Sequence, residues 1–186
     1  MRAKYRAMTV AILAVLAMAT VGIAQASAHE FKASAAGILK GKKTTAQIFD
    51  TNSGSFECSE ATSEAKVKAG SQSAFIDKVS FSGCKFFGFS FTTTVAEFEL
   101  GANESAYLLN KVTMSVIGAG CTMTLEPNKE AKTGAFANLS GGKMEATMEL
   151  LHIHFVSTGG LCGESGNMAF VGKSALELPG GTIEWK

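Results

Sequence analysis

The sequence predicts an all-β protein, an antiparallel β-sandwich or a partly open barrel, stapled by two disulfides. Three observations lead to this fold class. Most segments alternate apolar and polar residues with a period of two, which places alternate side chains on opposite faces of a strand. No segment carries a convincing apolar stripe at helical spacing. Four cysteines follow a leader of the secretory type, so they stand in a compartment where disulfides form.

The first 28 residues have the three-part pattern of a signal peptide. They open with a short basic stretch that contains Arg2, Lys4 and Arg6. An apolar run over residues 7–23 follows and ends in small residues, so we expect a signal peptidase to cut after Ala28 and leave His29 first. A cut after Ala26 is the second choice. An uncleaved anchor is disfavoured because the apolar run is at the lower length limit of a membrane span.

The sequence therefore divides into a signal peptide, residues 1–28, and a single secreted β-domain, residues 29–186. Three of the 17 basic residues, including every arginine, lie in the leader, which leaves 14 lysines against 16 acidic residues. An arginine-free, slightly acidic domain is a poor candidate for binding nucleic acid or an anionic membrane surface. We expect neither nucleic acid nor membrane among its partners after signal cleavage.

In the first part of the domain, several short segments have the alternation of strands. Residues 46–49 lead into residues 55–58 through a stretch in which Asn52 and Gly54 supply a turn, so a hairpin is expected. Residues 65–68 also alternate. In the segment 75–81, one face is expected to carry Phe75, Asp77, Val79 and Phe81.

Residues 86–92 are rich in phenylalanine and threonine and have strong strand composition. We expect one strand here, with one side carrying Phe87, Phe89 and Phe91. This aromatic cluster, with Phe86, is expected to be packed in the core. The alternative, a sugar-binding face, is less favoured because such faces usually display tryptophan or tyrosine.

The second part of the domain continues in the same way. Further strands are expected at residues 95–100, 107–117, 121–125, 143–156, 168–171, 174–178 and 182–185. In the longest of them, Leu151, Ile153 and Phe155 are expected on one face, with His152 and His154 on the other. About ten short strands that show no strictly regular repeat favour the sandwich over the barrel.

The four cysteines contain no closely spaced pair of the kind that holds zinc, so structural disulfides are expected. Four cysteines allow three connectivities. We favour Cys58–Cys84 and Cys121–Cys162, because each bridge joins neighbours in the sequence through strands that can pair.

A frame of short motifs surrounds these cysteines: Phe56-Glu57-Cys58, residues 79–84 followed by Phe87-Gly88, residues 120–123, and Cys162. It resembles a group of uncharacterised secreted four-cysteine all-β proteins of soil actinobacteria. The resemblance covers most of the mature chain. It implies an extracytoplasmic β-domain of bacterial origin with no known activity, and it assigns no functional residue.

No catalytic residue and no cofactor are expected, because the chain lacks a Gly-x-Ser-x-Gly elbow and other catalytic patterns. The leading interpretation is a non-enzymatic structural or binding module of the extracellular space or cell envelope, with an unknown ligand. The alternative is a copper-binding protein or copper oxygenase. Its terminal amine and imidazole at His29 would hold the ion together with His152 or His154. The plainer interpretation, that no metal is bound and the strand histidines are solvated, is preferred.

We expect the secreted protein to begin at His29 or Ser27, because the leader has the pattern of a cleaved signal peptide. Mass spectrometry of the intact secreted protein and of its first peptide measures this end. Recovery of the protein only in membranes, with residues 1–23 still attached, would contradict the expectation.

Overall fold

The computed structural model describes residues 29–118, 120–128, 132–159 and 162–186, and the expected signal peptide lies outside them. All regular structure in these residues is antiparallel strand, and both expected disulfides are present, so the predicted fold class is confirmed. The strands are β1 (Phe31–Ala33), β2 (Gly37–Lys43), β3 (Gln47–Thr51), β4 (Gly54–Val67), β5 (Gly70–Gln72), β6 (Ala74–Phe86), β7 (Phe89–Thr93), β8 (Ala96–Gly101), β9 (Ser105–Leu108), β10 (Val112–Val116), β11 (Cys121–Leu125), β12 (Lys132–Leu139), β13 (Lys143–Thr158), β14 (Gly166–Glu177) and β15 (Ile183–Trp185). Over the same residues, no helix is long and apolar enough to cross a membrane.

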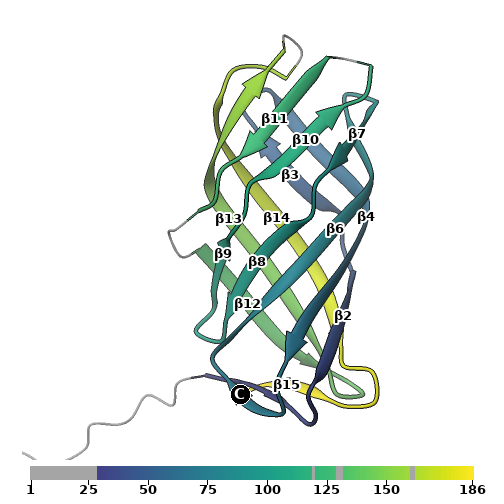
Figure 1. Ribbon diagram of the computed structural model, residues 1–186, viewed down its shortest axis with the longest axis vertical. Helices are drawn as coiled ribbons and strands as arrows, with labels where there is room; N and C mark the ends of the chain where they lie inside the picture. Colours follow the sequence, from purple (N-terminus) through teal and green to yellow (C-terminus); the bar gives the residue numbers. More distant parts are fainter. Residues whose placement is uncertain (1–28, 119, 129–131, 160–161) are drawn as a thin grey trace, which may run out of the picture.

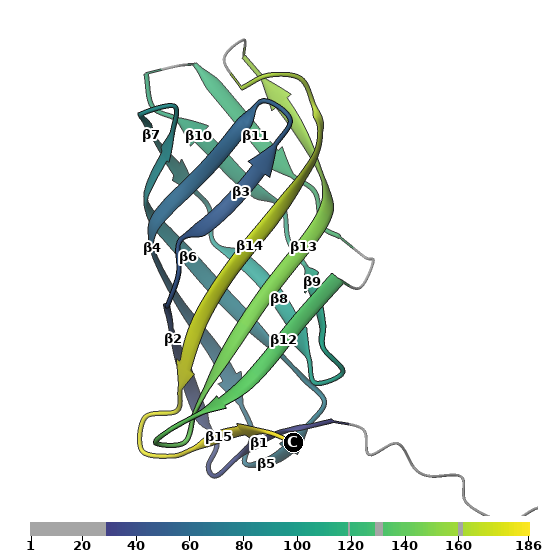
Figure 2. The same ribbon diagram turned by 180° about the vertical axis from the view of Figure 1, so that it is seen from behind.

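Twelve strands form one sheet that closes on itself (Figures 1 and 2). Their order is β11-β10-β7-β6-β8-β9-β12-β13-β14-β2-β4-β3, and additional pairs join β11 to β13, β6 to β4 and β14 to β3. The additional pairs connect the ends of the sheet to strands within it, so the wall surrounds one interior. This circuit has the form of a barrel, the second of the two architectures that the sequence left open.

Four long strands, β4, β6, β13 and β14, run through the whole height of the wall. Along one edge, each long strand pairs first with one shorter strand and then with a second. β13, for example, pairs with β12 over residues 143–149 and with β11 over residues 155–158. Each long strand therefore changes its pairing partner about halfway along its length.

A second sheet of three strands, in the order β15-β1-β5, closes the lower end of the barrel in Figure 1. The side chain of Phe31 on β1 is fully buried there. Its ring meets the edges or faces of Phe75 and Phe136, with both centroid distances at 4.8 Å. The backbones of Glu30 and Lys186 exchange two hydrogen bonds of 2.8 and 2.9 Å, so both ends of the domain lie at this "capped end".

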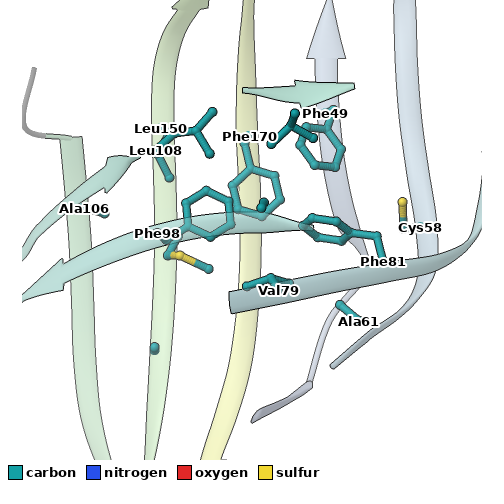
Figure 3. Packing of buried hydrophobic residues seen from close by; sticks show 14 of the residues in the cluster. Phe49, Cys58, Ala61, Val79, Phe81, Phe98, Ala106, Leu108, Leu150 and Phe170 are labelled. Carbon is teal, nitrogen blue, oxygen red and sulfur yellow. The ribbon is translucent and has the colours of Figure 1, made fainter. Parts of the chain in front are cut away.

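The interior is filled by side chains from opposite walls (Figure 3). Phe170 of β14 lies at the centre of an aromatic group. Its ring centroid is 4.7 Å from that of Phe49, 5.4 Å from that of Phe98 and 5.9 Å from that of Phe81. These rings come from β3, β6, β8 and β14, so the aromatic group ties together strands that are distant in the sequence.

Three expectations about individual segments are wrong. Residues 86–92 are not one strand: β6 ends at Phe86, β7 begins at Phe89, and Phe87 and Gly88 form the turn between them with positive φ. Residues 107–117 are interrupted between β9 and β10. There the Asn110 side chain accepts from Glu97 N and donates to Val95 O, both at 2.8 Å, which takes the place of the strand ladder.

The third error concerns Leu151, which is exposed although it was expected beside Ile153 and Phe155. A bulge places Leu151 and His152 opposite the single residue Ala169, and His152 adopts a φ of 59°. The extra residue reverses the alternation of β13. It lies between the parts of β13 that pair with β12 and with β11.

The expected inward face of β6 is confirmed, since Phe75, Asp77, Val79 and Phe81 are all buried. The carboxyl of Asp77, whose residue is 1% exposed, thus lies among apolar side chains. Burial raises its pKa from 3.8 to about 6, and the nearby Ser63 hydroxyl partly lowers it. Oδ1 of Asp77 and Oγ of Ser63 each lack a hydrogen-bond partner within the described residues, so the hydroxyl acts only weakly on the carboxyl.

Asp77→Asn is expected to stabilise the protein at neutral pH. The unfolded carboxyl ionises near its ordinary pKa, whereas the folded one keeps its proton until about pH 6, so the ionisable group reduces stability as pH rises through this window. The variant should gain up to about 3 kcal/mol over wild type at about pH 8 and little at about pH 3.5.

Urea unfolding at both pH values measures the difference. Asp50→Asn is the matched control, because the Asp50 side chain is exposed and hydrogen-bonds Ser55. A gain for Asp77→Asn that is the same at both pH values, or a loss at about pH 8, would contradict the assignment of a buried, neutral carboxyl.

Candidate functional site

Four turns lie together at the end of the barrel opposite the cap, at the top of Figures 1 and 2. We call this surface the loop end. It comprises the described residues of four segments: 51–54, 86–89, 117–120 and 157–166. They connect β3 to β4, β6 to β7, β10 to β11 and β13 to β14.

The turns contact one another in a ring. A Cβ on Gly54 would come 2.7 Å from Cζ of Phe87, so the first turn lies directly against the second. Ile117 N donates to Ser90 O at 2.8 Å, which joins the third turn to β7 beside the second. The positions of these turns are therefore set by their neighbours as well as by their own strands.

The fourth turn completes the ring. A Cβ on Gly159 would come 3.0 Å from Cα of Cys121, next to the third turn. A Cβ on Gly163 would come 2.9 Å from Cβ of Ser53, in the first turn. Both glycines have positive φ, a conformation that favours glycine, so these close approaches depend on the absence of a side chain.

Both disulfides lie at this end, and their pairing is the one favoured from the sequence. Cys58 and Cys84 are direct partners on β4 and β6, just below the first two turns. Cys121 at the start of β11 is bonded to Cys162 in the fourth turn. Chain-entropy arithmetic gives ideal stabilisations of about 3.5 and about 4 kcal/mol for closing these two loops. The first bridge thus ties the strands that carry the first two turns, and the second ties the fourth turn to the strand that follows the third.

A column of aromatic rings runs from the barrel interior to the second turn. Phe56 and Phe86 are stacked at a centroid distance of 3.9 Å, and Phe91 meets Phe56 at 5.3 Å. The ring of Phe87 continues the column at 4.4 Å from that of Phe86. The core beneath the loop end is therefore as closely packed as the capped end.

The expectation that the whole aromatic cluster is core is wrong for its outer members. Phe86 and Phe91 are buried, but Phe87 is 71% and Phe89 is 48% exposed. Ile117 in the neighbouring turn is 59% exposed. Phe87 lies in the turn between β6 and β7, Phe89 is the first residue of β7, and Ile117 directly follows β10. The glycines at positions 88 and 118 were the sequence signals for the two turns.

A pocket of about 320 Å³ lies between the first and fourth turns. It has Phe155 among its lining, and the polar groups around it belong to Asn52, Ser53, Glu164, Ser165 and Asn167. Ser165 is held in place because its hydroxyl accepts from Ser157 N at 2.9 Å. These hydroxyl and amide groups, with one carboxylate, can bind a small polar ligand. No sequence pattern indicated that they come together.

The outer wall of the lower half has a different chemistry. Its main feature is a charge belt, formed by Lys143, Glu177, Lys40, Glu64, Lys78 and Glu97 on consecutive strands. Two shallow hollows of about 550 and 560 Å³ lie on it and share Glu64 and Lys78. Lys78 already pairs with Glu97 at 2.7 Å. Because each charge faces an opposite one, the belt has little net field to offer a ligand.

The three histidines of the copper alternative do not come together. His29 stacks on Trp185 at the capped end, with ring centroids 4.4 Å apart. His152 and His154 are exposed on β13, about ten residues beyond its start near β15, a separation of roughly 30 Å along the strand. Within the described residues, no group of three histidine, cysteine or acidic side chains is placed to hold a metal ion.

We expect weak copper binding that does not depend on His29. A histidine brace needs a second histidine at about 2 Å from the same ion, and the fold separates the candidates. Titration of the cleaved protein with Cu²⁺, beside a His29→Ala variant, measures this. Sub-micromolar affinity that the substitution abolishes would contradict the expectation and favour the copper alternative.

Comparisons with protein-family models, with curated proteins and with solved structures find no match to this chain. The candidate site is therefore defined by its own geometry. It is an end of the barrel where four turns meet, both disulfides lie, a polar pocket opens and three apolar side chains are exposed.

Proposed function

We propose that this protein is a secreted bacterial β-module without enzymatic activity, which binds a ligand of the cell envelope or extracellular space through its loop end. The observation that carries the proposal is the position of the two disulfides. Cys121–Cys162 bonds the fourth turn to the start of β11, and Cys58–Cys84 joins β4 to β6 just below the first two turns. The leader pattern and the resemblance to secreted four-cysteine proteins support the compartment.

Stapled turns favour binding because a surface that is ordered in advance loses less conformational entropy when a ligand arrives. Loops positioned by a rigid scaffold are also where binding residues usually lie. The capped end is filled by the chain ends and β15. The lower wall carries the charge belt with its two shallow hollows, and ion pairs already join several of its charges.

The side chains at the loop end also support a binding role. They provide aromatic and aliphatic surface, hydroxyls and amides, with Glu164 as the charged group of the pocket. Recognition surfaces commonly combine these groups. Acid–base chemistry would instead draw on matched pairs of titratable groups, of which the loop end contributes a single carboxylate.

Ile117→Lys at the loop end is expected to weaken binding to cell envelopes from the encoding organism. A charge in a buried apolar contact is costly, so a loss of about tenfold or more in affinity is expected, equivalent to about 1.4 kcal/mol. Ile76→Lys on β6 is the matched control, since Ile76 is also an exposed isoleucine, at 44%, but lies on the wall.

Co-sedimentation of the purified mature protein with the envelopes, over a range of protein concentrations, gives both affinities. Circular dichroism of each variant checks that the fold is intact. If Ile117→Lys binds as well as wild type, or if Ile76→Lys alone loses binding, the loop end is not the binding surface and the proposal is wrong.

A further inference from the structure

Three exposed apolar side chains occupy neighbouring tips of the loop end: Phe87, Phe89 and Ile117. Phe89 follows the Phe87–Gly88 turn directly, and Ile117 is tied to the residue after Phe89 by the hydrogen bond from Ile117 N to Ser90 O. The three residues therefore lie at the same part of the rim, and we call their side chains the apolar tip.

Phe87 occupies a position where folding alone favours another residue. It and Gly88 form a two-residue hairpin connection, with φ values of 46° and 85°. Such a connection favours Asn-Gly, because both central residues have positive φ. A bulky residue is strained there, and burial does not compensate, since 71% of Phe87 is exposed. The aromatic ring is thus placed at a structural cost, which suggests a contact outside the chain.

Charge is almost absent around the apolar tip. The sequences of the four turns contain one charged residue, Glu164. Below the tip, Glu57 and Lys85 face each other across β4 and β6 and have opposite signs, and Asp50 directly precedes the first turn. The charge belt lies in the other half of the barrel. Contact between this end of the barrel and an apolar phase would therefore remove few charges from water.

The size of the apolar tip distinguishes between possible occupants. A buried phenylalanine side chain covers about 150–250 Å², so three partly exposed side chains present roughly 300 Å² in total. A stable protein–protein interface, including one between two copies of this chain, buries about 800 Å² on each partner. Shallow insertion into lipid needs no complementary surface, and a few protruding apolar side chains suffice for reversible attachment.

We propose that the loop end docks on a zwitterionic phospholipid bilayer by inserting the side chains of Phe87, Phe89 and Ile117 into its interfacial layer. This inference rests on the proposed function and names its ligand class. It revises the expectation of no membrane contact, which was based on the missing arginines and the removal of the signal peptide. Insertion of the uncharged apolar tip requires neither arginine residues nor the signal peptide. Both ends of the described domain, at Glu30 and Lys186, then point away from the bilayer.

Phosphatidylcholine vesicles and the mature protein test the proposal by flotation. The decisive variant is Phe87→Asn, because asparagine is the residue that this turn favours, so the variant should fold at least as well as wild type. We expect it to lower the vesicle partition coefficient about tenfold, and Ile117→Ser to do so as well. Ile76→Ser on the wall is the matched control and should bind like wild type.

Two further readouts test the mode of binding. Wild-type binding should persist at 1 M NaCl, where the Debye length is about 3 Å, and should not require anionic lipid. Trp185 lies at the capped end, where its indole Nε1 donates to Ala102 O at 2.9 Å. Brominated lipids should therefore leave its fluorescence unquenched. Quenching of Trp185, or binding that salt abolishes, would overturn the proposed orientation and mechanism.

Failure of this inference is distinguishable from failure of the proposed function. If envelopes bind the protein through the loop end but pure lipid vesicles do not, the ligand is another envelope component and the lipid proposal is wrong. If Phe87→Asn instead dissolves a dimer seen by sedimentation equilibrium, the apolar tip belongs to a second copy of the chain, which also overturns it. The lipid proposal is also wrong if Phe87→Asn and Ile117→Ser both bind vesicles as well as wild type.

Discussion

The pairing of β4 with β6 joins the two parts of the barrel wall, and the loop end depends on it. β4 carries β2 and β3 on its other edge, and β6 carries β7 and β8. In both strands the inward face shifts by one residue at the same height. Cys58 and Ala61 are buried on β4, and Phe81 and Cys84 on β6, each three residues apart rather than two. The Cys58–Cys84 bridge lies at this shift, where it holds the two strands in register.

Where a strand keeps one partner and one face, its sequence was sufficient to predict it. Residues 75–81 on β6 are the clearest example, since their alternation correctly placed even a carboxyl, that of Asp77, in the interior. The disulfide pairing was also predictable, because each bridge joins two cysteines that are neighbours in the sequence. Both predictions rest on local information. The hairpin between β3 and β4 was found for the same reason, through the turn residues Asn52 and Gly54.

What the sequence did not predict depends on contacts between distant segments. The bulge at Leu151 and His152 lies where β13 changes partner, and nothing in those two residues indicates a bulge. β2 and β12 have glycine- and lysine-containing sequences with weak strand composition, and they are strands because long neighbours pair with them. The loop end was missed for a related reason. The exposure of Phe87 follows from a turn that contains none of the residues usual at its first position.

The central place of β1 in the cap has a consequence for the order in which the chain folds. β1 is the first strand of the domain, yet one of its two partners is β15, which follows every other strand. Phe31 can take its final place between β5 and β15 only after residues 183–185 have been synthesised. The cap is thus completed last, and a chain that crosses a membrane unfolded acquires its final contacts only after translocation of the domain is finished.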